Sequence, residues 1–193
     1  MSFTEVTIPG HSFEVGGRTV RLFQHKFKAS TTLPVALEWI LSNSQEATPP
    51  GISIPFLYQE VSLFWHLNTR RFIAYTLKLE TMTAFDPRIS TKRLIFVAHT
   101  HPTPSDLPSG KTVQWHTTRP SPKDTSGMMP NQQYSIVVHR DTKTNKIPHA
   151  FIYSRKGNVT QKFVRNFQRV AQTYIQLETK ASTLARKVGQ YKR

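Results

Sequence analysis

Two histidines, His99 and His101, are the residues whose type and spacing point most directly to chemistry. They follow segment 93–98, which is nearly all apolar and predicts a strand buried on both faces. In an extended chain residues i and i+2 project from the same face, so both imidazoles can reach one ion. Zinc accepts neutral histidine nitrogens and commonly has three protein ligands in a hydrolytic site. The pair therefore predicts two zinc ligands; two histidines that only hydrogen-bond in a core are the alternative.

The residues around this pair extend the pattern. Glu60 stands directly before the apolar and aromatic segment 61–65, and Pro102 follows His101. Six residues after Pro102 comes Ser109. A glutamate-led strand, a His-Thr-His-Pro strand and a serine, in this order and spacing, resemble the JAMM/MPN family of metalloprotease-like domains. The resemblance spans roughly residues 18–155.

The resemblance implies a role for each matching residue. Glu60 is expected to be the general base that takes a proton from the attacking water and passes it to the leaving amine. His99 and His101 are expected to hold Zn²⁺, and Ser109 to donate a hydrogen bond to the oxyanion. The implied activity is that of a zinc-dependent metalloprotease or isopeptidase (a deubiquitinase-like hydrolase) acting on a protein substrate, often a ubiquitin-like conjugate.

The chain departs from the family pattern at the third metal ligand. The family carries aspartate three residues after the serine, and this chain has Thr112 there, whose neutral hydroxyl is a poor zinc ligand. Asp106, three residues before Ser109, is the replacement ligand that we expect if the loop is shifted. Otherwise the domain is metal-free or weakly metallated, and it is a pseudoenzyme that serves as a scaffold subunit of an assembly. Ser62 and His66 also replace the small residues that usually flank the glutamate-led strand.

Each of these residues has an ordinary structural role as its alternative. Glu60 on its own reads as a strand-edge acid. Ser109 can be a helix N-cap, and Asp106 can cap the turn that follows it.

The elements that would position the site predict an α/β fold. Residues 18–28 read as one strand, Thr31 or Thr32 caps a helix that continues to Ser42, and residues 43–51 form a loop. Further strands are predicted at 61–65, 71–79, 93–98, 134–139 and 149–154. Residues 102–132 are mostly loop, with a helix start only at 110–117. We expect a mixed central β-sheet flanked by helices, JAMM/MPN-like with cytidine-deaminase-like layering, and a long C-terminal helix.

The C-terminal segment has a different pattern. Its apolar residues follow a heptad spacing that predicts one helix from about 158 to 188; they are Phe163, Phe167, Val170, Tyr174, Leu177, Ala181, Leu184 and Val188. The sequence thus divides into a JAMM/MPN-like domain, 1–157, and a basic heptad-patterned helix, 158–193. We expect residues 158–188 to meet a partner helix or a second copy; packing on their own domain is the alternative.

Composition limits the remaining functions. The net charge is +15, and residues 155–193 hold ten Lys and Arg against one acid, Glu178, so nucleic-acid binding through this helix stays an alternative function. No paired carboxylates suit a two-metal nuclease. The absence of cysteine excludes disulfides and cysteine-ligated zinc. With no long apolar run and no signal peptide, we expect a cytoplasmic or nuclear protein that is not secreted and has no membrane partner.

Overall fold

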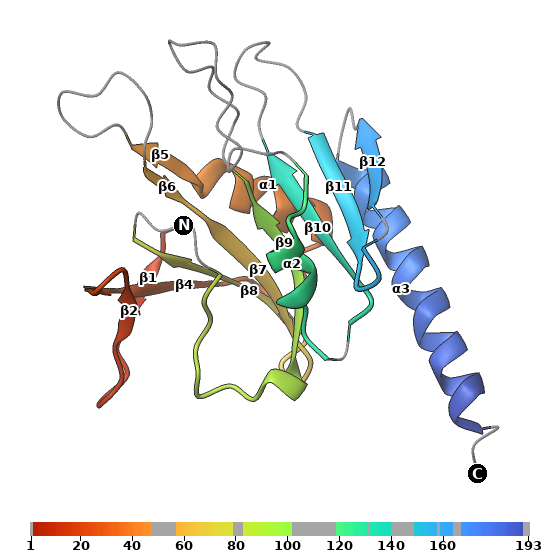
Figure 1. Cartoon of the computed structure of the whole chain (residues 1–193), viewed down its shortest axis with the longest axis horizontal. Helices are drawn as coiled ribbons and strands as arrows, with labels where there is room; N and C mark the ends of the chain where they lie inside the picture. Colours follow the sequence, from red (N-terminus) through yellow and green to blue (C-terminus); the bar gives the residue numbers. More distant parts are fainter. Residues whose placement is uncertain are drawn as a thin grey trace.

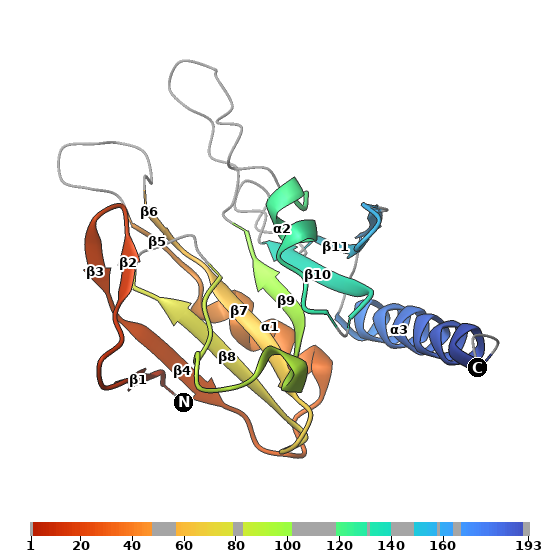
Figure 2. The same ribbon diagram turned by 60° about the horizontal axis from the view of Figure 1, so that its bottom comes forward.

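The computed structural model is a mixed sheet with helices on both faces (Figures 1 and 2). It describes residues 2–47, 57–78, 83–101, 119–130, 132–139, 149–157, 159–163 and 167–190. Eight strands form the main sheet in the order β1-β4-β8-β7-β9-β10-β11-β12, and two small sheets pair β2 with β3 and β5 with β6. The strands are β1 (Thr4–Val6), β2 (Phe13–Val15), β3 (Arg18–Val20), β4 (Leu22–Lys26), β5 (Gln45–Ala47), β6 (Leu57–Gln59), β7 (Val61–His66), β8 (Arg71–Leu77), β9 (Leu94–Thr100), β10 (Tyr134–His139), β11 (His149–Ser154) and β12 (Val159–Phe163). The helices are α1 (Leu33–Asn43), the 3-10 turn η1 (Thr91–Arg93), α2 (Pro122–Ser126) and α3 (Phe167–Gln190).

The sheet is mixed because one of its pairs is parallel. Strands β9 and β10 run parallel, and the other pairs of the main sheet are antiparallel. The α/β class with a mixed central sheet, expected from the sequence, is confirmed. The central strands lie within about two residues of the segments that their β-branched, aromatic and apolar residues predict.

Helices α1 and α3 cover one face of the sheet. Apolar residues of α1 recur at helical spacing and are buried together with those of α3 and the central strands; in α1 they are Leu33, Ala36, Leu37, Ile40 and Leu41. A second buried cluster, which includes Phe64, Tyr75 and Phe96, lies on the other face. The short helix α2 lies on that second face (Figure 2). The side chains of the main sheet therefore point either to the face that α1 and α3 cover or to the opposite face, which carries α2 and is called the α2 face below.

The C-terminal region corrects the prediction of one helix from residue 158. Residues Val159–Phe163 form β12, which pairs antiparallel with β11, and α3 begins only at Phe167. A tight turn closes this hairpin, since Gly157 has a φ of 80° and its N–H donates to Ser154. The heptad spacing includes Phe163 by coincidence. The position of this residue fits the heptad of α3, although it belongs to strand β12.

The first half of the heptad seam packs on its own domain. Phe167, Val170 and Tyr174 are buried in the cluster under α1, and Leu177 packs partly against it. This is the alternative that the sequence left open for these positions, and it makes them unavailable to a partner helix. Leu184 and Val188 lie where side chains are not described, so a partner for that end stays a prediction.

Three smaller sequence predictions are wrong. Residues 18–28 form two strands, β3 and β4, in different sheets, and Gln45–Ala47 of the expected loop form β5. Within 102–132, residues Pro122–Ser126 form α2. The expected helix start at 110–117 lies outside the described residues. Among the helices that the structure describes, none combines the length and the apolar character that crossing a bilayer requires.

Candidate metal centre

The two histidines owe their orientation to a β-bulge in β9. Leu63 and Phe64 of β7 are opposite Ala98 and Phe96 of β9, so Val97 is an extra residue in the ladder. Val97 and Ala98 are therefore both buried in the cluster under α1 and α3. The alternation then resumes with His99 on the α2 face, where its ring stacks on Phe96 at 5.3 Å. His101, two residues on, projects to the same side.

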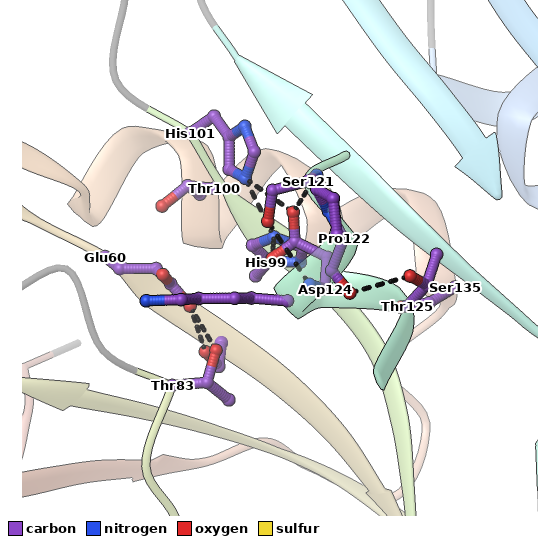
Figure 3. A network of polar contacts seen from close by, with 12 residues as sticks. Glu60, Thr83, His99, Thr100, His101, Ser121, Pro122, Asp124, Thr125 and Ser135 are labelled. Carbon is purple, nitrogen blue, oxygen red and sulfur yellow. Dashed lines mark hydrogen bonds and ion pairs between the residues drawn. The ribbon is translucent and has the colours of Figure 1, made fainter. Parts of the chain in front are cut away.

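Helix α2 brings a carboxylate to these histidines. Its start follows from the sequence: Ser121 is the N-cap, Pro122 fits the first helical position and Asp124 is the third. The Ser121 hydroxyl accepts from the Asp124 N–H at 3.2 Å, and the Asp124 carboxylate accepts from the Ser121 N–H. This capping box fixes the carboxylate at the N-terminal end of α2. Figure 3 shows Ser121 and Asp124 beside His99 and His101.

The three side chains converge at the spacing that a zinc ion requires. His99 Nε2 lies 3.0 Å from His101 Nε2, and the Asp124 carboxylate oxygens lie 3.1 Å from His99 Nε2 and 3.4 Å from His101 Nε2. Ligands about 2.0 Å from a tetrahedral zinc ion are about 3.3 Å apart. The separation of the two nitrogens and that of each nitrogen from its nearer carboxylate oxygen are close to this value, and with one ligand atom per residue the three atoms lie within 4.8 Å of one another. Two imidazole nitrogens and a carboxylate are also a donor set that zinc prefers. The residues present therefore fit a zinc ion.

The charges of the site favour a cation between these ligands. Burial raises the pKa of Asp124, but the hydrogen bonds from His101 and His99 outweigh it and hold the pKa well below its ordinary value. Burial lowers the pKa of His99, but the hydrogen bond to Asp124 and the charge of Glu60 outweigh it, so the pKa is raised. Two neutral imidazole nitrogens 3.0 Å apart need a proton or a metal ion between them, because their lone pairs repel. Zinc would take the place of that proton.

Glu60 lies beside the cluster with one oxygen left free. It directly precedes β7, it is 7% exposed, and it shares the α2 face with Ser62, which is opposite His99 in the ladder. Ser62 Oγ donates to Glu60 Oε1 at 2.9 Å, and Thr83 Oγ1 donates to the same oxygen at 2.6 Å. Oε2 accepts no hydrogen bond from the residues that the structure describes. Two hydroxyls thus orient the carboxylate and leave one oxygen available as a base.

Neighbouring strands fix the distance between Glu60 and the histidines. The Val61 N–H donates to Thr100 Oγ1 at 3.0 Å, which takes the place of a ladder hydrogen bond where β7 begins. The His101 N–H donates to the carbonyl of Val138 at 2.9 Å. Behind α2, the Arg155 guanidinium donates to the carbonyls of Met128 and Gln132. These contacts hold β7, β9 and α2 together around the cluster.

The three candidate ligands differ in their exposure. The His99 side chain is 0% exposed, whereas those of His101 and Asp124 are 13% and 16% exposed. A catalytic zinc site keeps one position for water or substrate. Access from the side of His101 and Asp124 is consistent with such a site.

The structure brings together part of the predicted site. Glu60, His99 and His101 lie close to one another, as expected. Asp106, Ser109 and Thr112 lie outside the described residues, so the roles predicted for Asp106 and Ser109 remain predictions. His66 lies at the far end of β7, where its Nδ1 is 2.7 Å from Thr69 Oγ1.

The residue that sequence reasoning missed is Asp124. The signal was present, because Ser121-Pro122-Lys123-Asp124 is itself a Ser-x-x-Asp segment. Eighteen residues separate it from Pro102, whereas the family pattern has its serine after six, at Ser109.

No protein-family model matches this chain, and no curated protein and no solved structure is significantly similar to it. A function must therefore come from the chemistry of the site.

Proposed function

We propose that this protein is a zinc-dependent hydrolase of the JAMM type that cleaves a peptide or isopeptide bond in a protein substrate. The observation that carries the proposal is the approach of His99 Nε2, His101 Nε2 and the Asp124 carboxylate to within 3.0–3.4 Å of one another. The buried Glu60 beside them makes the cluster suited to hydrolysis as well as to metal binding.

The chain's own residues divide the work of such a reaction. Glu60 takes a proton from the attacking water through Oε2 and passes it to the leaving amine. Ser62 and Thr83 hold that carboxylate through Oε1, so its orientation does not change during the transfer. When bound, zinc supplies a Lewis acid that lowers the pKa of water and polarises a carbonyl.

Ser121 is the second residue to which we assign a catalytic role. Its oxygen accepts from the Asp124 N–H, so its own proton is available to a further acceptor. A hydroxyl three residues before a metal ligand can donate to an oxyanion that forms near the metal. Ser121 thereby takes the role that the family resemblance would give to Ser109.

Asp124 bears on the choice between an enzyme and an inactive scaffold. The scaffold alternative rests on the loss of the third ligand at Thr112. Asp124 supplies a carboxylate from another part of the chain, which supports a metallated site. A metal-free or weakly metallated site is what the scaffold alternative predicts.

The test is hydrolysis by the zinc-loaded protein of isopeptide-linked ubiquitin dimers and of internally quenched peptides. We expect cleavage that 1,10-phenanthroline abolishes and that Glu60→Gln removes while zinc stays bound. Glu38→Gln, at an exposed acid on α1, is the matched control and retains activity. No cleavage of either substrate by the zinc-loaded protein would reject the hydrolase, and a protein that does not take up zinc would favour the scaffold.

A further inference from the structure

A second candidate site lies on the opposite face of the sheet. Residues of α1, α3, β7, β8 and β9 line an open cavity of 310 Å³. Its walls are mostly apolar and include three aromatic side chains, Trp65, Phe72 and Tyr174. A volume near 300 Å³ with aromatic walls is at the lower end of the range of small-molecule sites. This face does not contain the zinc ligands, so the cavity is independent of the function proposed above.

One acidic side chain, Glu178, interrupts the apolar lining. It is the only acid between residues 155 and 193, in a chain of net charge +15. Its carboxylate accepts from the backbone N–H of Gln133 at 3.1 Å and 3.3 Å and from that of Tyr134 at 3.4 Å. Within the described part of the chain, no Lys, Arg or His forms an ion pair with it. Glu178 is thus a fixed negative charge in an apolar wall without a described counter-charge.

The carboxylate keeps capacity for another donor. Each carboxylate oxygen has about two acceptor sites, and Oε2 accepts only from Gln133 among the described residues. Burial raises the pKa of Glu178 against the lowering effect of these two N–H groups, which means that its charge is poorly solvated. A cation placed there would be stabilised by both the carboxylate and the aromatic faces.

We infer that this cavity binds a small organic cation, a molecule with a protonated nitrogen on an apolar and preferably aromatic body. The nitrogen pairs with Glu178, and the body lies against Trp65, Phe72 and Tyr174. Ile175 of α3 lines the cavity and is 54% exposed. It gives the cavity an apolar rim that the apolar part of the ligand contacts as it enters.

The test compares two probes of the same shape, 4-phenylbutylamine and its uncharged counterpart 4-phenylbutan-1-ol. Binding is measured by calorimetry and by the change in tryptophan fluorescence, since Trp65 lines the cavity. We expect the amine to bind at least about tenfold more tightly than the alcohol, the ratio expected for one charge-assisted hydrogen bond. Because this comparison uses the unaltered chain, it does not depend on whether any variant folds.

A variant then tests whether Glu178 is the residue that recognises the positive charge of the ligand. Glu178→Gln keeps the shape of the side chain and is expected to remove the preference for the amine, whereas Glu38→Gln on the exposed side of α1 preserves it. Equal affinity for the two probes, no binding of either, or an unchanged preference in Glu178→Gln would each overturn the inference.

Discussion

Replacing Asp124 with asparagine is expected to remove zinc binding while the fold is kept. Asparagine has the same shape, and its carbonyl oxygen can still accept from the Ser121 N–H, so the capping box that starts α2 keeps this hydrogen bond. The change removes the negative charge and puts an amide nitrogen in place of the oxygen that lies 3.1 Å from His99 Nε2.

The size of the effect follows from the ligand count. Asp124 supplies one of three protein donors and the only negative charge among them. Loss of an outer partner that merely orients a ligand weakens metal binding about 10- to 100-fold. Loss of a direct ligand should exceed this, so we expect at least about 100-fold weaker zinc binding, equivalent to about 2.7 kcal/mol.

The assay is competition for zinc against a chromophoric chelator, with thermal unfolding of each metal-free protein as the check on folding. Asp106→Asn is the matched control, since Asp106 is the ligand that the local sequence would favour. The reasoning is refuted if Asp124→Asn binds zinc as tightly as the unaltered chain, or if only Asp106→Asn loses it.

Three further predictions concern the base, the strand register and an ion pair. Glu60→Gln is expected to lower the hydrolytic rate about 10²- to 10⁴-fold while the zinc content, measured by mass spectrometry, stays the same. Thr100→Val leaves the Val61 N–H without its acceptor and should lower the free energy of unfolding, measured in urea, by about 1–3 kcal/mol. The hydrogen bond from Arg88 lowers the pKa of Asp86, so its stabilisation is present above about pH 4 and is lost as the pH falls through the lowered value. Asp86→Asn should therefore be less stable by about 1 kcal/mol at pH 7, and the difference, measured in urea titrations, should shrink as the pH falls below about 4.

Each of these has an outcome that contradicts it. Full hydrolytic activity in Glu60→Gln would remove the proposed base. Unchanged stability in Thr100→Val would mean that Val61 finds another acceptor. A stability difference for Asp86→Asn that does not shrink as the pH falls below about 4 would show that the carboxylate acts through packing and not through its charge.

The sequence predicted the central elements because their patterns are local. Runs of β-branched and aromatic residues mark β7, β8 and β10, and Thr31 or Thr32 with Pro34 marks the start of α1. The pair of histidines could be placed on one face from the i, i+2 rule alone. The expectation that Glu60 lies beside the histidines came from the family resemblance, in which a glutamate-led strand comes before the histidine strand.

The rest depended on contacts between distant parts of the chain. The bulge at Val97, which turns His99 to the α2 face, appears only in the pairing of β9 with β7. Val159–Phe163 fits both a strand and the heptad spacing, and pairing with β11 decides between them. Asp124 was missed because it is 23 residues after His101, farther along the sequence than the family spacing places the third ligand.

X-ray absorption at the zinc edge, on protein purified without chelator, tests the central claim most directly. We expect one zinc ion per chain, bound by two imidazole nitrogens and at least one oxygen at about 2.0–2.1 Å. In Asp124→Asn this signal should be lost. Protein that holds no zinc after incubation with it, or zinc bound without two imidazoles, would contradict the account.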